Sequence, residues 1–150
     1  MSTAFAELYS LINAAYVADT GSTGLNDSTK AANAYLRGEM WRSGDTDNRD
    51  LNWPKVIVSV VNQQETDSFG INKVEMVGQF DIIAKADNRF AALDAVAARL
   101  RAVYHQVVLS GGTQWNFNEM VFKTEQQAQP PSDNESRAVI RWQITGRKVA

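Results

Sequence analysis

The sequence predicts a two-layer α+β sandwich, in which two helices pack on a mostly antiparallel sheet of about four strands and long loops join the elements. Two segments with apolar side chains at three- and four-residue spacing predict the helices, and alternating or continuous apolar segments predict the strands. Both helices must bury an apolar stripe, and one face of a sheet is the simplest partner for them. A length of 150 residues, of which 44% are hydrophobic, predicts one domain over residues 1–150.

The first helix is predicted over Ala4–Ala18, where apolar residues from Phe5 to Tyr16 recur at helical spacing. The turn-forming residues 19–24 end it. Residues 19–34 and 42–52 are polar and predict long loops, and residues 35–41 between them predict a short strand or edge segment. Loops this long in a compact domain are usually functional or await a partner.

A β-hairpin is predicted in the middle of the chain. Residues 55–61 are continuously apolar and predict a strand that is buried on both faces. The polar segment Asn62–Asn72 predicts the hairpin tip, and Lys73–Lys85 predicts the return strand. Val77 and Ile83 interrupt the polar face of this strand, so we expect part of that face to be covered.

The second helix is predicted to carry an apolar stripe from Phe90 to Val107 and to end before Gly111. A strand is predicted over residues 114–124, with Trp115, Phe117 and Val121 on one face.

Residues 125–135 contain two prolines and predict an exposed loop. The final strand is predicted over residues 137–149, with Arg137, Arg141 and Arg147 on its polar face.

Composition excludes several classes of protein. The 15 Lys and Arg against 17 Asp and Glu give a net charge of -2 without a polybasic block, which argues against tight sequence-independent DNA binding. The absence of cysteine excludes disulfide scaffolds, thiolate metal sites and cysteine nucleophiles. No apolar run approaches the roughly 18 residues of a membrane span, and the N-terminal residues do not resemble a secretory signal. We therefore expect a soluble protein without membrane contact.

The segment Asp19-Thr20-Gly21-Ser22 matches the tetrapeptide of aspartic proteases. That chemistry needs two carboxylates that share a proton, supplied by a second copy of the motif or by a second subunit. No second copy is present, and the motif follows a helix instead of lying between apolar strands. A turn is therefore the preferred interpretation, and a protease that uses Asp19 is the main enzyme alternative.

Neither the acidic loop nor the single histidine predicts a site. Asp45, Asp47 and Asp50 resemble the start of a calcium loop, but Asp50 and Val56 stand where glycine and glutamate are required. His105 lies near the end of the second helix, where the helix dipole favours a cation. We predict no catalytic residue, no cofactor and no metal site.

The four tryptophans fall into two groups. Trp115 and Trp142 fit core positions by alternation. Trp41 and Trp53 flank a polar loop, where tryptophan indicates either a satellite cluster within the monomer or an anchor in a subunit interface.

The order of elements resembles phage tail terminator (tail completion) proteins of the lambda type and their neck-protein relatives. The resemblance is carried by Pro54-Lys55-Val56-Ile57-Val58, by Phe80-Asp81-Ile82 running into the helix 89–105, and by Arg137-Ala138-Val139-Ile140-Arg141-Trp142. The pattern extends over nearly the whole chain. The loop with Asp45, Asp47 and Asp50 has no counterpart in it.

The resemblance implies a structural virion protein, not an enzyme. Such proteins form rings, usually of six subunits, that cap the tail tube, stop its elongation and join the tail to the head-side connector. The implied partners are copies of the chain itself, the tail tube protein and the connector or stopper, with DNA only passing through the lumen. The implied location is the neck or tail of a virion assembled in the host cytoplasm.

A ring needs heterologous contacts, and the long loops are natural arms for them. The expected interface residues are Trp41, Trp53, Phe69, Asn72, Pro130 and Pro131. The alternatives are another neck protein (head-closure or adaptor subunit), the Asp19 enzyme, and an α+β module that binds a small ligand.

Overall fold

The computed structural model describes residues 3–20, 24–25, 40–42, 55–68, 71–85, 89–128 and 135–149. This part of the chain contains two helices and seven strands. They are α1 (Thr3–Ala18), β1 (Met40–Arg42), β2 (Lys55–Ser68), β3 (Ile71–Lys85), α2 (Arg89–Tyr104), β4 (Val107–Val108), β5 (Trp115–Phe117), β6 (Glu119–Ala128) and β7 (Glu135–Lys148).

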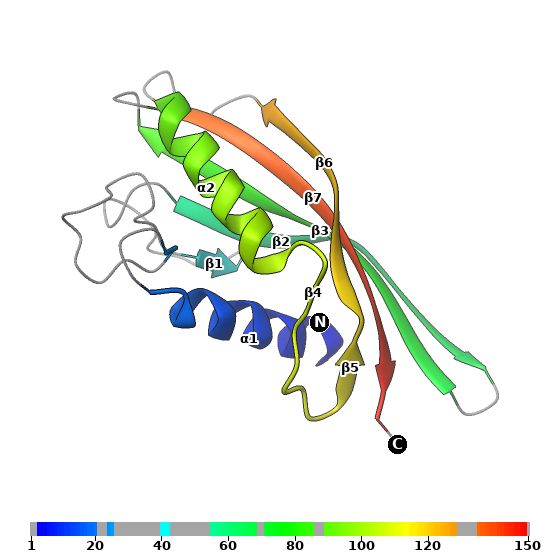
Figure 1. Cartoon of the computed structure of the whole chain (residues 1–150). Helices are drawn as coiled ribbons and strands as arrows, with labels where there is room; N and C mark the ends of the chain where they lie inside the picture. The colour runs from blue at the N-terminus through cyan, green and yellow to red at the C-terminus, as the bar shows by residue number, and fades with distance from the viewer. Residues whose placement is uncertain are drawn as a thin grey trace.

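The strands form a single sheet with the order β1-β2-β3-β7-β6-β4, and β5 pairs with β7 beside β6. Only β1 runs parallel to its neighbour, so the sheet is mostly antiparallel, as predicted. Both helices lie on one face of it (Figure 1). The prediction of about four strands was too low, because β1, β4 and β5 have two or three residues each and are too short to show a period in the sequence. Neither described helix is long and apolar enough to cross a membrane.

The predicted hairpin tip at Asn62–Asn72 is wrong, because the strands continue through almost all of it. Pairing between β2 and β3 extends to Ser68 opposite Ile71. Backbone hydrogen bonds between the two strands hold these polar residues extended, although their side chains gave no strand signal. The hairpin therefore projects past α1 and β5 as an arm (Figure 1), which we call the β2–β3 arm (residues 62–68 and 71–77).

Two further predictions fail in the second half of the chain. α2 ends at Tyr104, because Gln106 takes a left-handed conformation (φ 58°) and the next residues form β4. The predicted strand over residues 114–124 is broken at Asn118, whose N–H donates to the Thr145 carbonyl oxygen at 2.8 Å. This break shifts the alternation, so that Met120 and Phe122 are buried and Val121 lies on the opposite face.

β6 also continues to Ala128, and β7 begins at Glu135. Both strands thus extend into the segment that was predicted to be an exposed loop.

The core lies between the helices and the sheet, and Phe80 of β3 is at its centre. The Phe80 ring centroid lies 5.3 Å from that of Tyr104, 5.9 Å from that of Phe122 and 6.0 Å from that of Trp142. Burial raises the pKa of the Tyr104 hydroxyl, and electrostatic interaction with Tyr16 and with the Asp19 carboxylate raises it further. The hydroxyl therefore stays protonated and donates to the Ile12 carbonyl oxygen at 2.7 Å, which joins α2 to α1.

Gly78 of β3 lies directly beneath the Trp142 indole, because the two residues are register partners. A Cβ atom at position 78 would overlap the indole ring and lie 2.7 Å from the Ser59 carbonyl oxygen. Trp142 is fully buried and the Ser59 oxygen is backbone, so neither can move away cheaply. The position requires glycine for close approach between neighbouring strands.

An ion pair joins the end of α1 to α2. Asp19 accepts a hydrogen bond from Arg99 Nε at 2.9 Å, a second from Arg99 Nη2, and one from the Leu25 N–H at 2.7 Å. Burial alone would raise the pKa of Asp19, but the hydrogen bonds from Arg99 and Leu25 and the charge of Arg99 outweigh it and hold the pKa below its usual range.

Replacement of Gly78 by alanine is expected to reduce the free energy of unfolding by about 3 kcal/mol, because the added methyl group overpacks the Trp142 contact. Urea unfolding followed by tryptophan fluorescence measures the change. Glu75→Ala is the matched control, since Glu75 is exposed in the same strand. Equal stability of the two variants would contradict the proposed contact.

Asp19→Asn is expected to cost about 1–2 kcal/mol at pH 7, because Arg99 then loses its charged partner. The folded pKa of Asp19 is lowered, so its contribution is complete above the unfolded pKa of about 4 and is lost as pH falls through the folded pKa. The difference between wild type and variant should therefore shrink in urea titrations as the pH falls below about 4. A difference that is constant over this pH range would show that the ion pair is not its source. Asp94→Asn, at an exposed position of α2, is the control.

Candidate functional site

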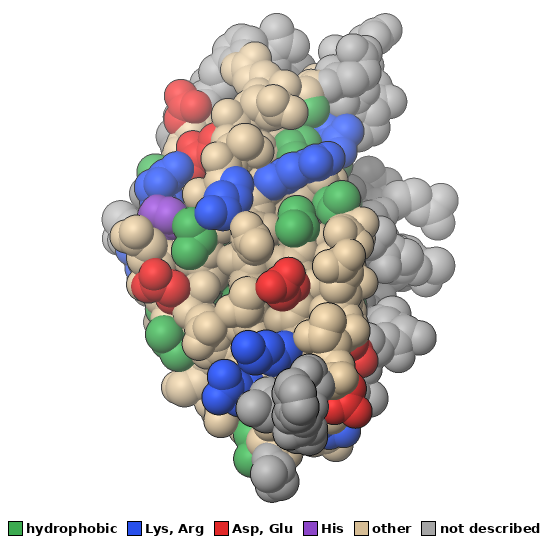
Figure 2. Space-filling model, turned by 90° about the vertical axis from the view of Figure 1, so that its right-hand side faces the viewer, with side chains coloured by type: hydrophobic (Ala, Val, Ile, Leu, Met, Phe, Trp, Pro, Cys, Tyr) green, Lys and Arg blue, Asp and Glu red, His purple; other side chains and the backbone are tan. Residues whose placement is uncertain are grey.

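One face of the sheet is not covered by the helices. α1 and α2 pack on the side of the sheet that carries Phe80 and Trp142 (Figure 1). We call the opposite side the helix-free face. It is formed by the described residues of β2, β3, β7 and β6 whose side chains point away from the helices. Figure 2 shows this side of the molecule, with two groups of Lys and Arg side chains toward its two ends and hydrophobic side chains between them.

An apolar row crosses the middle of the helix-free face. The bulge after Val60 sets Val61 and Asn62 of β2 opposite Val77 of β3. Val77 pairs with Gln143 of β7, and Gln143 pairs with Val121 of β6. Val61 is 48% exposed, and Val77 and Val121 are half-buried. We call these three valines the apolar row.

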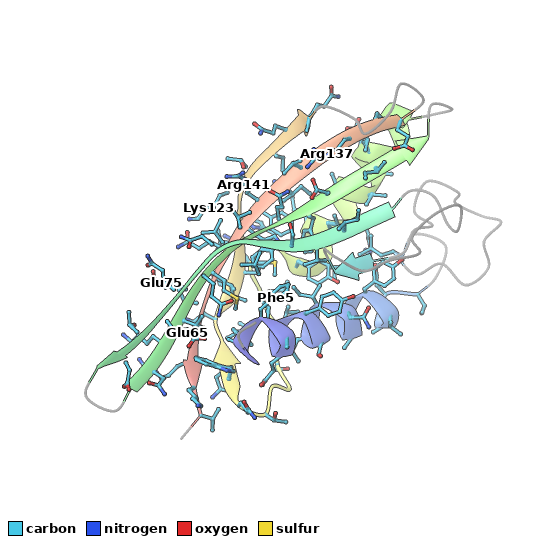
Figure 3. All side chains as sticks on the ribbon, turned by 180° about the vertical axis from the view of Figure 1, so that it is seen from behind. Phe5, Glu65, Glu75, Lys123, Arg137 and Arg141 are labelled. Carbon is cyan, nitrogen blue, oxygen red and sulfur yellow. The ribbon has the colours of Figure 1, made fainter. Side chains whose placement is uncertain are left out.

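A cationic patch lies beside the apolar row, on the side away from the arm. Arg141 pairs with Gln79 of β3, and a second bulge sets both Lys123 and Thr124 opposite Arg141. Figure 3 shows that Lys123, Arg137 and Arg141 lie in the same half of the sheet, and that Glu65 and Glu75 lie toward the arm. We call Lys123, Arg137 and Arg141 the cationic patch.

Asp81 neutralises one member of the cationic patch. Its side chain is largely buried and accepts hydrogen bonds from Arg137 Nε and from Gln79 Nε2, each at 2.9 Å. Among the described residues, Lys123 and Arg141 make no ion pair, and both are exposed. The patch therefore presents two uncompensated positive charges.

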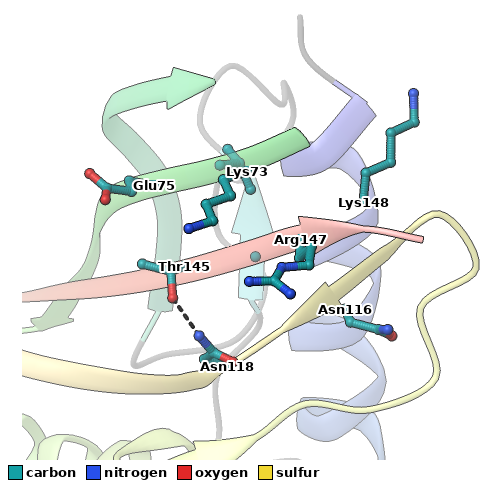
Figure 4. Close-up of a pocket in the computed structure, with 9 residues that line it drawn as sticks. Lys73, Glu75, Asn116, Asn118, Thr145, Arg147 and Lys148 are labelled. Carbon is teal, nitrogen blue, oxygen red and sulfur yellow. Dashed lines mark hydrogen bonds between the residues drawn. The ribbon is translucent and has the colours of Figure 1, made fainter. Parts of the chain in front are cut away.

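An open groove of about 510 Å³ occupies the other half of the helix-free face, next to the arm (Figure 4). Lys73 and Arg147 are register partners in it, and like charges directly opposite each other destabilise a sheet. Asn118 closes one side through a 2.7 Å hydrogen bond from its amide to Thr145 Oγ1. With this lining, the groove suits a polar partner better than an apolar small molecule.

The helix-free face and the rest of the chain carry opposite net charges. The described side chains of this face include five cations and four anions, which are Lys73, Lys123, Arg137, Arg141 and Arg147, and Glu75, Asp81, Glu119 and Glu135. The face therefore carries +1, and since the whole chain carries -2, the remainder carries -3.

Of the six expected interface residues, the structure describes Asn72 and the backbone of Trp41. Trp41 lies in β1 with its backbone paired to Ile57, and nothing is described of its side chain. Asn72 pairs with Asp67 at the end of the arm and lines a hollow of about 370 Å³ with Trp115 and Lys148. The other expected interface residues lie outside the described residues; they are Trp53, Phe69, Pro130 and Pro131. The acidic loop with Asp45, Asp47 and Asp50 also lies outside them.

The candidate chemical residues have structural partners. The Asp19 carboxylate is held by Arg99 and Leu25, as described above. His105 lies in the turn after α2, where its Nδ1 accepts a 2.9 Å hydrogen bond from the Phe122 N–H and its ring packs 5.2 Å from the Phe122 ring. This hydrogen bond gives His105 a structural role in addition to the one that the helix dipole predicted. The described residues contain no group of acidic and histidine side chains that could hold a metal ion.

Sequence reasoning did not select the residues of the apolar row and the cationic patch as a site. The sequence did indicate one residue of this surface. Val77 is an apolar residue on the polar face of its strand, which predicted that part of this face is covered. Val61 was assigned to a strand buried on both faces, and the bulge at Lys123 gave no signal in the sequence. Bulges are set by strand pairing, which the order of residues does not display.

Comparisons with known proteins give one informative result. No family model and no curated protein match the sequence. Among solved structures, the fold is similar to a chain of a structure titled "Virion of native gene transfer agent (GTA) particle", with a TM-score of 0.58 and 14% sequence identity. The similarity covers 81% of this chain and 87% of that chain. At this level of identity, the similarity establishes that the two chains share a fold.

Proposed function

We propose that this chain is a structural component of a phage-like particle, acting as a tail terminator. The observation that carries the proposal is the shared fold with a virion chain over most of both chains. The order of strands and helices supports it, because it is the order on which the resemblance to tail terminators was based.

In this role the chain forms a ring through contacts with copies of itself, and the family resemblance implies six subunits. The ring caps the tail tube, stops its elongation and presents a surface to the head-side connector, while DNA passes through the lumen. The mechanism uses surface complementarity and no bond-making step. The ion pair at Asp19 and the hydrogen bond at His105 support this, because each gives its side chain a structural role.

Native mass spectrometry of the purified chain is expected to show a closed ring, with six copies of the 16.6 kDa chain giving a mass of about 100 kDa. Negative-stain images should show a central hole. A phage-like particle assembled without the protein should have overlong tails, because nothing would stop the tube from growing.

Asp19→Asn is the matched variant for the enzyme alternative, and it should form the same ring at neutral pH. Tails of correct length that fail to join heads would assign the chain to a head-side neck protein instead. A monomer that is absent from particles, or a proteolytic activity lost in Asp19→Asn, would overturn the proposed function.

A further inference from the structure

We infer that the helix-free face is the surface on which a second copy of this chain docks, and that it meets a different, acidic surface of that copy. This inference rests on the proposed function, since it names the contact through which the ring would close. It is carried by the area of the face, its arrangement of apolar and charged residues, the shape of the sheet edges and the separation of charge.

The helix-free face is large enough for a stable contact. Three strands of 14, 15 and 14 residues and one of 10, spaced about 4.8 Å apart with about 3.3 Å per residue, span roughly 840 Å². A stable protein interface buries about 800 Å² on each partner. The face is therefore as large as one side of a standard interface.

The arrangement of residues on the face is that of a protein contact. The apolar row (Val61, Val77, Val121) lies between the cationic patch and the polar groove. Protein interfaces have an apolar centre and a polar rim, and arginine is enriched in them. A face that only met water would have no reason to place three valines in one row.

The edges of the sheet are less suited than the helix-free face to docking of a second copy. The outer edges of β2 beyond Ser59 and of β6 beyond Phe122 have no partner strand among the described residues. Each carries a bulge, at Val61 and at Lys123, and bulges and charged side chains protect sheet edges from pairing. A second copy is therefore expected to dock on the face instead of extending the sheet.

The separation of charge selects a heterologous contact. Two helix-free faces packed on each other would set +1 against +1. The same face against the acidic remainder of another copy sets +1 against -3. A heterologous contact that repeats with rotation closes into a ring, which a face-to-face contact cannot do.

The test is the double charge reversal Lys123→Glu with Arg141→Glu, followed by sedimentation velocity and native mass spectrometry. The reversal should raise the concentration at which the ring half-dissociates by at least tenfold. The wild-type ring should also weaken between about 0.05 M and 0.5 M salt, because the contact is partly between exposed charges. Val77→Lys tests the apolar row and should weaken the ring similarly.

Arg101→Glu is the matched control, because Arg101 is an exposed arginine of α2 that pairs with Glu125 on the other side of the sheet. It should leave the ring intact, and circular dichroism melting of every variant separates loss of assembly from loss of folding. A wild-type ring that the double reversal and Val77→Lys leave unchanged would overturn this inference but not the proposed function. A wild type that is monomeric at all concentrations would overturn both.

Two further measurements distinguish other occupants. The chain contains no cysteine, so Gln143→Cys places a lone thiol in the centre of the face. Disulfide-linked dimers on oxidation would show two faces in contact with each other and overturn the heterologous contact. Binding of a fluorescent DNA duplex of about 30 base pairs, lost in the double reversal, would assign the face to a phosphate backbone instead.

Discussion

The packing of both helices on one face of the sheet is the constraint on which the rest of this structure depends. Phe80 and Trp142 lie at the centre of that packing, and Tyr104 ties the two helices together through its hydrogen bond to Ile12. Gly78 is part of the same constraint, because its lack of a side chain lets the Trp142 indole approach the neighbouring strand closely. Because one face is buried in this way, every side chain that points to the other face contacts either water or another molecule.

The two bulges modify this simple alternation. Each leaves one residue without a register partner, Val61 in β2 and Lys123 in β6. Both are exposed, and they belong to the apolar row and the cationic patch respectively. A regular strand would turn the next residues, Asn62 and Thr124, to the helix side, so the bulges shape the helix-free face as well as protect the edges.

The net charge of the chain does not show that positive and negative side chains are unevenly distributed over it. A value of -2 for the whole chain describes an unremarkable acidic protein, yet the described part of the helix-free face is positive and the remainder is negative. A single patch of either sign would bind an oppositely charged partner of any kind. Both signs on different sides of one chain favour association between copies, which is the property that a ring-forming structural protein needs.

The amino-acid order alone determined the class of the fold, the two helices and the strands β2, β3 and β7. Their signals are local, because helical spacing and apolar alternation are properties of neighbouring residues. The order alone placed the short segment of β1 at residues 35–41 and merged β5 with β6 into one strand. It did not give β4, the length of the β2–β3 arm, or the break at Asn118. These depend on backbone hydrogen bonds to distant strands, which hold polar or very short segments in place whatever their side chains.

The same division applies to the candidate site. Val77 stood out in the sequence as an apolar residue on a polar face. Its neighbours in the row, Val61 and Val121, come from strands far apart in the chain and meet it only through the register of the sheet. Tertiary structure therefore decided the surface, because register and bulges determine which side chains share a face, and both are set by pairing between segments that are separated in sequence.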